Sequence, residues 1–548
     1  MKNTRIFLIV ICLVFSMLTL CACPGGDPVS TTNPNSYDDK NSTKITFSQN
    51  DVNIKGVGAS ASGTDLRIGA QGTYVLSGET SNGSIVIDAG KADIRLVLEG
   101  ISITNTDGPA VYVKNANKVT FTIVEGTNNV LSDGNAYQIK DINTFVDGTI
   151  FAKSDLVFNG TGTLTVNGNN AHGIVSKDDL AIENGNINVN SKNAGICGKD
   201  SIEIANANIN INAGTDGLKS DNITEATKGY ITIQSGTFNI TCGNDAIQAF
   251  NVAKIEGGSF NIKTTSEDPM SSAKGIKSTT CVEILGGNFV IDSIDDSVHS
   301  DGNVSILGGD LFISSLDDGI HANNELSIAN GNVTINKSYE GLEATSIKIS
   351  GGRVEINSTD DGMNSAGGND QSSGDDAFGG TNGSVSILGG YTIIHSDADG
   401  IDLLGNFDMS AGVLIIDGTS KAKSGAIDFG SSSSITGGVI VALGVSNSAK
   451  NFTNATQGAI LTKSTINYDA DTVYSLCDEN GNVIVAFKST KTFKGMLISA
   501  PELTEGSTYT IYKNANVLGL DENGFAHNTT QSGGESCGTI TLDSLIIG

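Results

Sequence analysis

Acidic residues return at a regular spacing through the middle of this chain, where together they could bind cations. A tripeptide with a small middle residue occurs ten times between residues 172 and 401, and its first residue is acidic in seven of the ten. Asp296, Asp318, Glu340 and Asp361 follow one another at intervals of 22, 22 and 21 residues. Carboxylate oxygens are the ligands that Ca²⁺ prefers, and one ion binds about six to eight of them. The spacing therefore predicts calcium sites if the fold stacks these residues.

Stacked carboxylates are costly without a counter-charge. Neighbouring strands of a sheet lie about 4.8 Å apart, and two carboxylates at that distance repel by about 3.5 kcal/mol at an effective dielectric of about 20. The acids must therefore take up protons, splay into water or bind cations. We expect bound Ca²⁺; the alternative is a row of solvated, turn-forming Asp-Gly pairs without metal. The candidate ligands are Asp216, Asp221, Asp295, Asp296, Asp317, Asp318, Glu340, Asp360, Asp361, Asp399 and Asp402.

The repeat also predicts the fold that positions these acids. Within residues 296–317 we expect three short strands, at 296–300, 304–306 and 311–313, separated by Asp301-Gly302 and Gly308-Gly309. Three strands in a repeat of this length form one coil, here called a rung, of a parallel β-helix. Parallel crossovers are almost always right-handed. We therefore predict an all-β chain whose main body is a right-handed parallel β-helix.

Two further series share the same period. Alternate positions of the third strand are apolar in successive rungs, as in Phe238/Ile240, Phe260/Ile262 and Phe289/Ile291. Because side chains alternate between the two faces of a strand, each pair points inward and stacks on the next. Glycine pairs such as Gly257-Gly258 precede these strands, and glycine tolerates the positive φ that tight corners require.

The sequence divides into four parts. Residues 1–22 carry Lys2 and Arg5 before an apolar run and are typical of a lipoprotein signal peptide, with Cys23 as the lipidated residue. Residues 23–43 are polar and predict a flexible tether. Residues 44–445 form the β-helix, of which 44–170 are the N-terminal cap and early coils. Residues 446–548 are a small C-terminal antiparallel β-unit and tail. The lipoprotein signal predicts that the protein is located at the extracellular face of the cell membrane.

The formal net charge of −28 excludes some classes of partner. Such a surface repels nucleic acid and anionic lipid, so we expect no nucleic-acid partner and membrane contact only through the lipid anchor. An anionic ligand would need a bridging metal ion. We expect a monomer.

A polar row lies three residues after the first residue of each tripeptide. We expect these side chains to face outward on an exposed surface and to line a groove for a chain-like ligand. His299 and His321, one rung apart, could ligate a metal, but two exposed surface histidines are the simpler interpretation. The row consists of Lys219, Gln248, Lys277, His299, His321, Glu343, Asn364 and Asp402.

Several motifs resemble one family. The chain resembles bacterial, often clostridial, carbohydrate-binding domain-containing proteins with a polysaccharide-lyase-like right-handed β-helix, from about residue 45 to 515. The resemblance implies Ca²⁺ binding and recognition of plant cell-wall polysaccharides, including acidic sugars such as polygalacturonate, with cellulose as a further ligand to consider. It does not imply cleavage. The motifs are Gly160–Val166, Gly173–Leu180, Gly195–Asp200, Asp216–Asn222, Asp399–Asp402 and Gly437–Ile440.

Two functions are the main alternatives at this point; a hydrolase that uses paired aspartates and a passive adhesin or structural spacer are two further ones. The first is non-catalytic, surface-anchored binding of acidic polysaccharide through Ca²⁺, with no catalytic residues. The second is a calcium-dependent pectate lyase, in which β-elimination needs a base near the uronate C5 proton and a cation on its carboxylate. Lys219 is the best candidate for that base. Acids recur in rung after rung. This recurrence is typical of the repeat architecture and is weak evidence for a single active site.

Overall fold

The computed structural model describes residues 37, 39–137, 145–266, 271–365, 383–419 and 424–548. The predicted signal peptide, the lipidation site at Cys23 and most of the predicted tether lie outside these residues. The described chain is all β apart from one 3-10 helix, η1 (Asp39–Asn41). None of its helices is long and apolar enough to cross a membrane.

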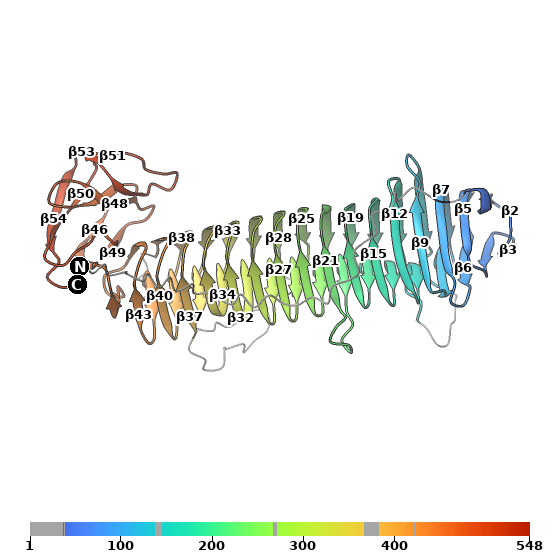
Figure 1. Cartoon of the computed structure of the whole chain (residues 1–548), viewed down its shortest axis with the longest axis horizontal. Coiled ribbons are helices and arrows are strands. Elements are labelled where there is room, and N and C mark those ends of the chain that lie inside the picture. The colour runs from blue at the N-terminus through green and yellow to red at the C-terminus, as the bar shows by residue number, and fades with distance from the viewer. Residues whose placement is uncertain (1–36, 38, 138–144, 267–270, 366–382, 420–423) are drawn as a thin grey trace, which may run out of the picture.

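The chain coils into a long parallel β-helix, and the fold prediction is confirmed (Figure 1). One rung consists of β29 (Val298–Ser300), β30 (Asn303–Ile306) and β31 (Asp310–Ser315), close to the three predicted strands. Each strand pairs in parallel with its equivalent in the next rung. His299 is the register partner of His321, and Leu311 that of Val333.

The first strands of successive rungs carry the tripeptides and the polar row. The third residue of each tripeptide points inward and is buried, as for Leu218, Ile247 and Ile276. These strands are β14 (His172–Ser176), β17 (Ile196–Gly198), β20 (Leu218–Ser220), β23 (Ile247–Ala249), β26 (Ile276–Ser278), β29, β32 (Ile320–Ile328), β34 (Leu342–Ile349), β36 (Met363–Ser365), β39 (Ile401–Leu403) and β42 (Ile427–Phe429).

The third strands build the predicted apolar core. Phe238, Phe260 and Phe289 are buried and stack face to face, with 4.6 Å between successive ring centroids. At the corner before these strands the second glycine of the pair has positive φ, for example 121° at Gly258. These third strands include β16 (Asn186–Ser191), β19 (Ala207–Ala213), β22 (Gly236–Cys242), β25 (Ser259–Thr264), β28 (Asn288–Ser293), β31, β33 (Asn332–Ser338), β35 (Arg353–Ser358), β38 (Tyr391–Ser396) and β41 (Val413–Asp417).

Antiparallel pairs close both ends of the stack (Figure 1). At the N-terminal end β1 (Thr43–Phe47) pairs antiparallel with β2 (Val52–Lys55) and in parallel with β5 (Gly72–Thr80). At the other end β44 (Val439–Gly444) pairs antiparallel with β49 (Phe493–Ser499).

The C-terminal antiparallel unit is present as predicted. β47 (Val473–Cys477) lies between β48 (Val483–Lys488) and β50 (Thr508–Lys513), and both pairings are antiparallel. Asp417 of the β-helix accepts hydrogen bonds from Ser489 and from the backbone of Thr490, so polar contacts join the unit to the coil.

Candidate functional site

The first residues of the tripeptides form an acidic column along one corner of the β-helix. In several rungs one oxygen of the acid accepts the backbone N–H of the equivalent residue in the next rung. Asp296 accepts from Asp318 at 3.0 Å, Asp318 from Glu340 at 3.3 Å, and Asp361 from Asp399 at 2.7 Å. A backbone N–H at a buried corner is costly to leave unpaired. The repetition therefore has a structural cause, and the second oxygen remains for a cation.

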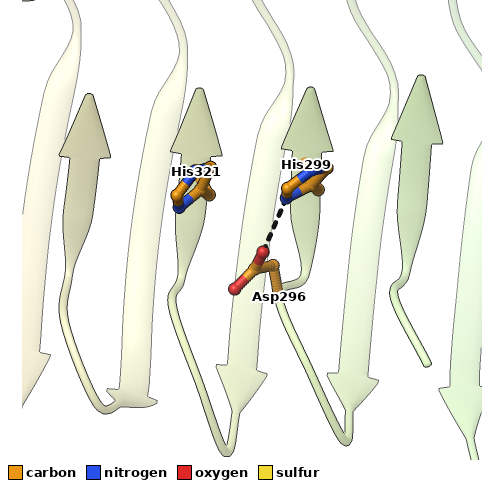
Figure 2. A group of neighbouring side chains, drawn as sticks. All are labelled: Asp296, His299 and His321. Atoms are coloured by element: carbon orange, nitrogen blue, oxygen red, sulfur yellow. Dashed lines mark hydrogen bonds and ion pairs between the residues drawn. The ribbon is translucent and has the colours of Figure 1, made fainter. Parts of the chain in front are cut away.

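The polar row points out of the coil, on the same side as the acidic column. His299 Nδ1 lies 2.7 Å from Asp296 Oδ2, and Figure 2 shows the His321 side chain beside them on the adjacent strand. The two imidazole rings stack with 4.9 Å between centroids. Side chains from neighbouring rungs therefore contact one another along this row.

The prediction that this row is exposed is wrong for its central part. His299, His321, Glu343 and Asn364 are between 3% and 7% exposed. Each long side chain lies against its equivalents one rung away, and such stacking removes most of the row from water. The interpretation of the two histidines as exposed surface residues is wrong for the same reason.

A lysine of the chain itself occupies one position in the acidic column. The Lys274 Nζ lies 2.6 Å from Asp295 Oδ2 and 3.2 Å from Asp296 Oδ2, and all three side chains are at most 4% exposed. Burial alone would lower the pKa of Lys274, but the two carboxylates outweigh it and raise that pKa. Burial would likewise raise the pKa of Asp296, whereas the ammonium and His299 hold it below its usual range. An ammonium thus supplies positive charge at two of the predicted calcium ligands.

Two more lysines pair with acids towards the N-terminal end of the column. Lys219 lies 2.9 Å from Asp216, and Lys277 lies 3.8 Å from Asp245. Burial lowers the pKa of Lys219, but its ion pair with Asp216 more than offsets this, and the net pKa is raised. Lys219 therefore holds its proton at neutral pH, which does not suit a general base.

Three predicted calcium ligands lie at the margins of the column. Asp221 is exposed, whereas Asp317 and Asp360 are half-buried. Oxygens of Asp317, Asp295 and Asp296 lie within 4.8 Å of one another, so the structure brings this trio together. Asp221 joins no such group among the described residues.

Asp361, Asp399 and Asp402 form a group of carboxylates without a lysine partner among the described residues. One oxygen of each lies within 4.8 Å of the others, and among the described residues none of the three forms an ion pair with lysine or arginine. Burial raises the pKa of Asp361 to about 8 and that of Asp399 to about 6, and the neighbouring carboxylates add to both shifts. The pKa of Asp402 is raised for the same reasons. This group therefore needs protons or a cation.

The raised pKa of Asp361 predicts how stability depends on pH in EDTA. Between an ordinary pKa near 3.8 and the folded value of about 8, the native state holds a proton that the unfolded state has released. Stability from this group is therefore lost as pH rises through that window. Because Asp361→Asn removes the titration but keeps an oxygen for the Asp399 N–H, it should reduce the loss between pH 5.5 and 8.5 by about 2–4 kcal/mol. Urea unfolding at both pH values measures this; equal pH dependence in the variant, or the same change in exposed Asp51→Asn, would contradict it.

Sequence reasoning missed one rung of the column. The tripeptide Gly425-Ala426-Ile427 lacks an acid, yet Gly425 N–H donates to Asp399, and Asp428 is the register partner of Asp402. The sequence signal for this rung is a small residue followed by isoleucine. Ala426, the small residue, lies 26 positions after Gly400. Lys450 pairs with Asp428 and so ends the lysine-free stretch.

A shallow groove crosses a different face, the outer side of the third strands β22 to β33. Val290 and Phe312, register partners in β28 and β31, are 51% and 46% exposed there. Asn239 continues an asparagine ladder on this face, donating to Asn210 at 2.9 Å. The sequence predicts a groove lined by the polar row. The groove in the structure lies on a different face, away from that row.

Comparison with known proteins gives the family. A model of the family described as "Carbohydrate-binding domain-containing protein" matches residues 62–319 and 313–476, most of the β-helix. The chain belongs to this family. The predicted resemblance to carbohydrate-binding domain-containing proteins is thereby confirmed, within narrower limits than residues 45 to 515.

One relative and one solved structure illustrate the extent of the likeness. A carbohydrate-binding domain-containing protein of Acetivibrio thermocellus is 35% identical over 185 residues, which is 33% of this chain and 64% of the relative. A polysaccharide lyase-like protein from C. thermocellum, solved as a gadolinium derivative, is 32% identical over 48% of this chain and 96% of its own, with a TM-score of 0.40.

Proposed function

We propose that this protein binds acidic plant cell-wall polysaccharides such as polygalacturonate, without cleaving them, through Ca²⁺ held by Asp361, Asp399 and Asp402. The observation that carries the proposal is the convergence of three carboxylates with raised pKa values and no lysine or arginine ion pair among the described residues. A protein with a net charge of −28 repels a polyuronate unless a cation lies between them. Family membership supports a carbohydrate ligand.

The donor set fits a hard cation. The three side chains offer carboxylate oxygens only, which suits Ca²⁺. One oxygen of Asp361 and one of Asp399 accept backbone N–H groups, which fixes the orientation of these two carboxylates. Asp399 and Asp402 are half-buried and not fully enclosed, so a sugar carboxylate can approach the ion. Bound Ca²⁺ supplies the positive charge that attracts uronate.

The non-catalytic assignment rests on Lys219, the best candidate for a lyase base. Its ion pair with Asp216 keeps it protonated, and it lies on β20, whereas the calcium group lies at β36 and β39. Proton abstraction beside a metal-bound uronate needs the base and the metal at one sugar. We propose further that lipid on Cys23 holds the domain at the cell surface.

The first test is binding of polygalacturonate to the soluble chain, measured by isothermal titration calorimetry in Ca²⁺ and in EDTA. We expect binding in Ca²⁺ only. Asp399→Asn combined with Asp402→Asn should weaken it at least about tenfold, because it removes two of the three charged ligands. Asp51→Asn with Asp107→Asn, an equal charge change at exposed positions far along the chain, is the matched control and should bind normally.

Two outcomes contradict the proposal. Sustained release of unsaturated uronides, followed by ultraviolet absorbance and abolished by Lys219→Ala, would establish a lyase. Binding that persists in EDTA and is lost in Phe312→Ala would place the ligand on the groove of β28 and β31, where an exposed aromatic ring suits stacking on a neutral sugar.

A further inference from the structure

A second group of ligand atoms lies two rungs before the calcium group and contains nitrogen. Asp318 lies two residues before the start of β32, His321 lies in β32, and Glu343 lies in β34 as the register partner of His321. The His321 Nδ1 is 3.1 Å from Asp318 Oδ2 and 3.0 Å from Glu343 Oε2. All three side chains are at most 6% exposed. The group is thus a buried set of one imidazole and two carboxylates.

The separations within this set match those between ligands of one metal ion. Metal–ligand bonds of about 2.0–2.2 Å place neighbouring ligands about 3.0 Å apart in an octahedron and about 3.4 Å apart in a tetrahedron. Both N–O separations fall at the octahedral value. One oxygen from each acid lies within 4.8 Å of the other and of the imidazole nitrogen. The three ligand atoms are therefore close enough together to reach one ion, and two of their three separations already match those of an octahedron.

The imidazole is oriented as a metal ligand would be. His321 Nε2 lies 2.9 Å from Asn323 Oδ1, and because an amide oxygen only accepts, Nε2 carries the hydrogen. That contact aims Nδ1 at the two carboxylates. A partner on the second ring nitrogen that fixes tautomer and orientation is typical of ligating histidines.

The charges around this set favour a cation. Two carboxylates converge on one imidazole nitrogen, so their formal negative charge exceeds the single positive charge that one imidazolium carries. In the next rung Glu340 Oε2 is buried and has no hydrogen-bond partner among the described residues. The neighbouring pair of Asp296 and His299, drawn in Figure 2, differs because it already has a positive charge beside it. The Lys274 Nζ lies 3.2 Å from Asp296 Oδ2.

We propose that Asp318, His321 and Glu343 form a site for a divalent transition-metal ion of the Zn²⁺ class. An imidazole ligand selects such ions over Ca²⁺, which binds oxygen. The site is distinct from the calcium group, and it does not depend on the polysaccharide. Rung stacking gives it a structural role as well, since the metal joins β32 to β34.

Co²⁺ is the probe, because its visible absorption reports an ordered coordination sphere. Adding Co²⁺ to the metal-free full chain should give bands that saturate at one equivalent and that Zn²⁺ displaces. His321→Gln should lower the Co²⁺ affinity at least about tenfold, and Asn323→Ala, which keeps all three ligands, should lower it by about tenfold. His527→Gln is the matched control, because His527 also lies 3.0 Å from a carboxylate, Glu502, but at the surface.

The two proposals can fail separately. Asp399→Asn with Asp402→Asn should keep the Co²⁺ bands, and Asn323→Ala should keep calcium-dependent glycan binding. The transition-metal site is overturned if wild type gives no saturable bands, if His321→Gln leaves them unchanged, or if His527→Gln lowers the affinity as much. Circular dichroism confirms that each variant is folded, and Asn323→Ala keeps the test decisive if His321→Gln does not fold.

Discussion

Replacing Lys274 by methionine is expected to lower the free energy of unfolding by about 3–5 kcal/mol. Methionine keeps most of the length of the side chain and the backbone N–H that donates to Asp245 at 2.9 Å. It removes the ammonium that lies within 3.2 Å of both Asp295 and Asp296. Two buried carboxylates then have no ammonium beside them, and breaking a buried ion pair costs far more than the pair contributes when intact.

Urea unfolding in EDTA measures this loss, and two variants control for it. Lys219→Met leaves one buried carboxylate, Asp216, which keeps a hydrogen bond from Asn244, so it should cost less, about 1–2 kcal/mol. Lys274→Met combined with Asp295→Asn and Asp296→Asn should recover most of the stability, because no buried charge is left unpaired. The interpretation fails if Lys274→Met and Lys219→Met cost the same, or if the triple variant is no more stable than Lys274→Met.

The sequence predicts the β-helix well because several series share one period. Strand positions, the inward isoleucines and the stacked phenylalanines each depend on neighbours one rung away, and a repeat of 22 residues places those neighbours. The glycine corners follow from the same reasoning, since positive φ at Gly258 is a local requirement. Local conformation and nearest-rung packing are therefore readable without a structure.

The chemistry of the acidic column is less readable. Several of its acids share one structural task, which is to accept the backbone N–H of the next rung, and no spacing reveals this task. The partner of the second oxygen differs from rung to rung: Lys274 at Asp296, His321 at Asp318, and other carboxylates at Asp361. Lys274 stands in the tripeptide series, but only the structure shows that its ammonium lies between two acids of the following rung. Burial of His321 likewise depends on side chains from adjacent rungs.

A methyl group added at Gly341 is expected to cost about 3 kcal/mol or more. A Cβ there would lie 2.3 Å from the backbone oxygen of Gly362 and 2.3 Å from Ile356 Cγ2. The Gly362 oxygen belongs to the next rung and accepts the Leu342 N–H at 3.1 Å. It therefore cannot move away from Gly341 without disturbing that hydrogen bond. Overpacking a dense core usually costs about 1–3 kcal/mol, and a clash with paired backbone lies at or above the upper end. The small middle residue of the tripeptide is thus a steric requirement of rung stacking, since no positive φ is involved at Gly341.

Gly341→Ala is compared with Gly69→Ala by thermal and urea unfolding. At Gly69 a Cβ would meet nothing closer than a backbone oxygen at 4.0 Å, so alanine should be neutral or should stabilise the chain by up to about 1 kcal/mol. Ala246 and Ser297 show that some rungs accept a Cβ at the equivalent position, so Ala246→Gly should lose only about 1 kcal/mol. The room for a Cβ at the middle residue therefore differs from rung to rung. A loss below about 1 kcal/mol in Gly341→Ala would mean that neighbouring rungs separate easily, and the ladder of acid-to-backbone bonds along the same corner could not then hold ligands at fixed distances.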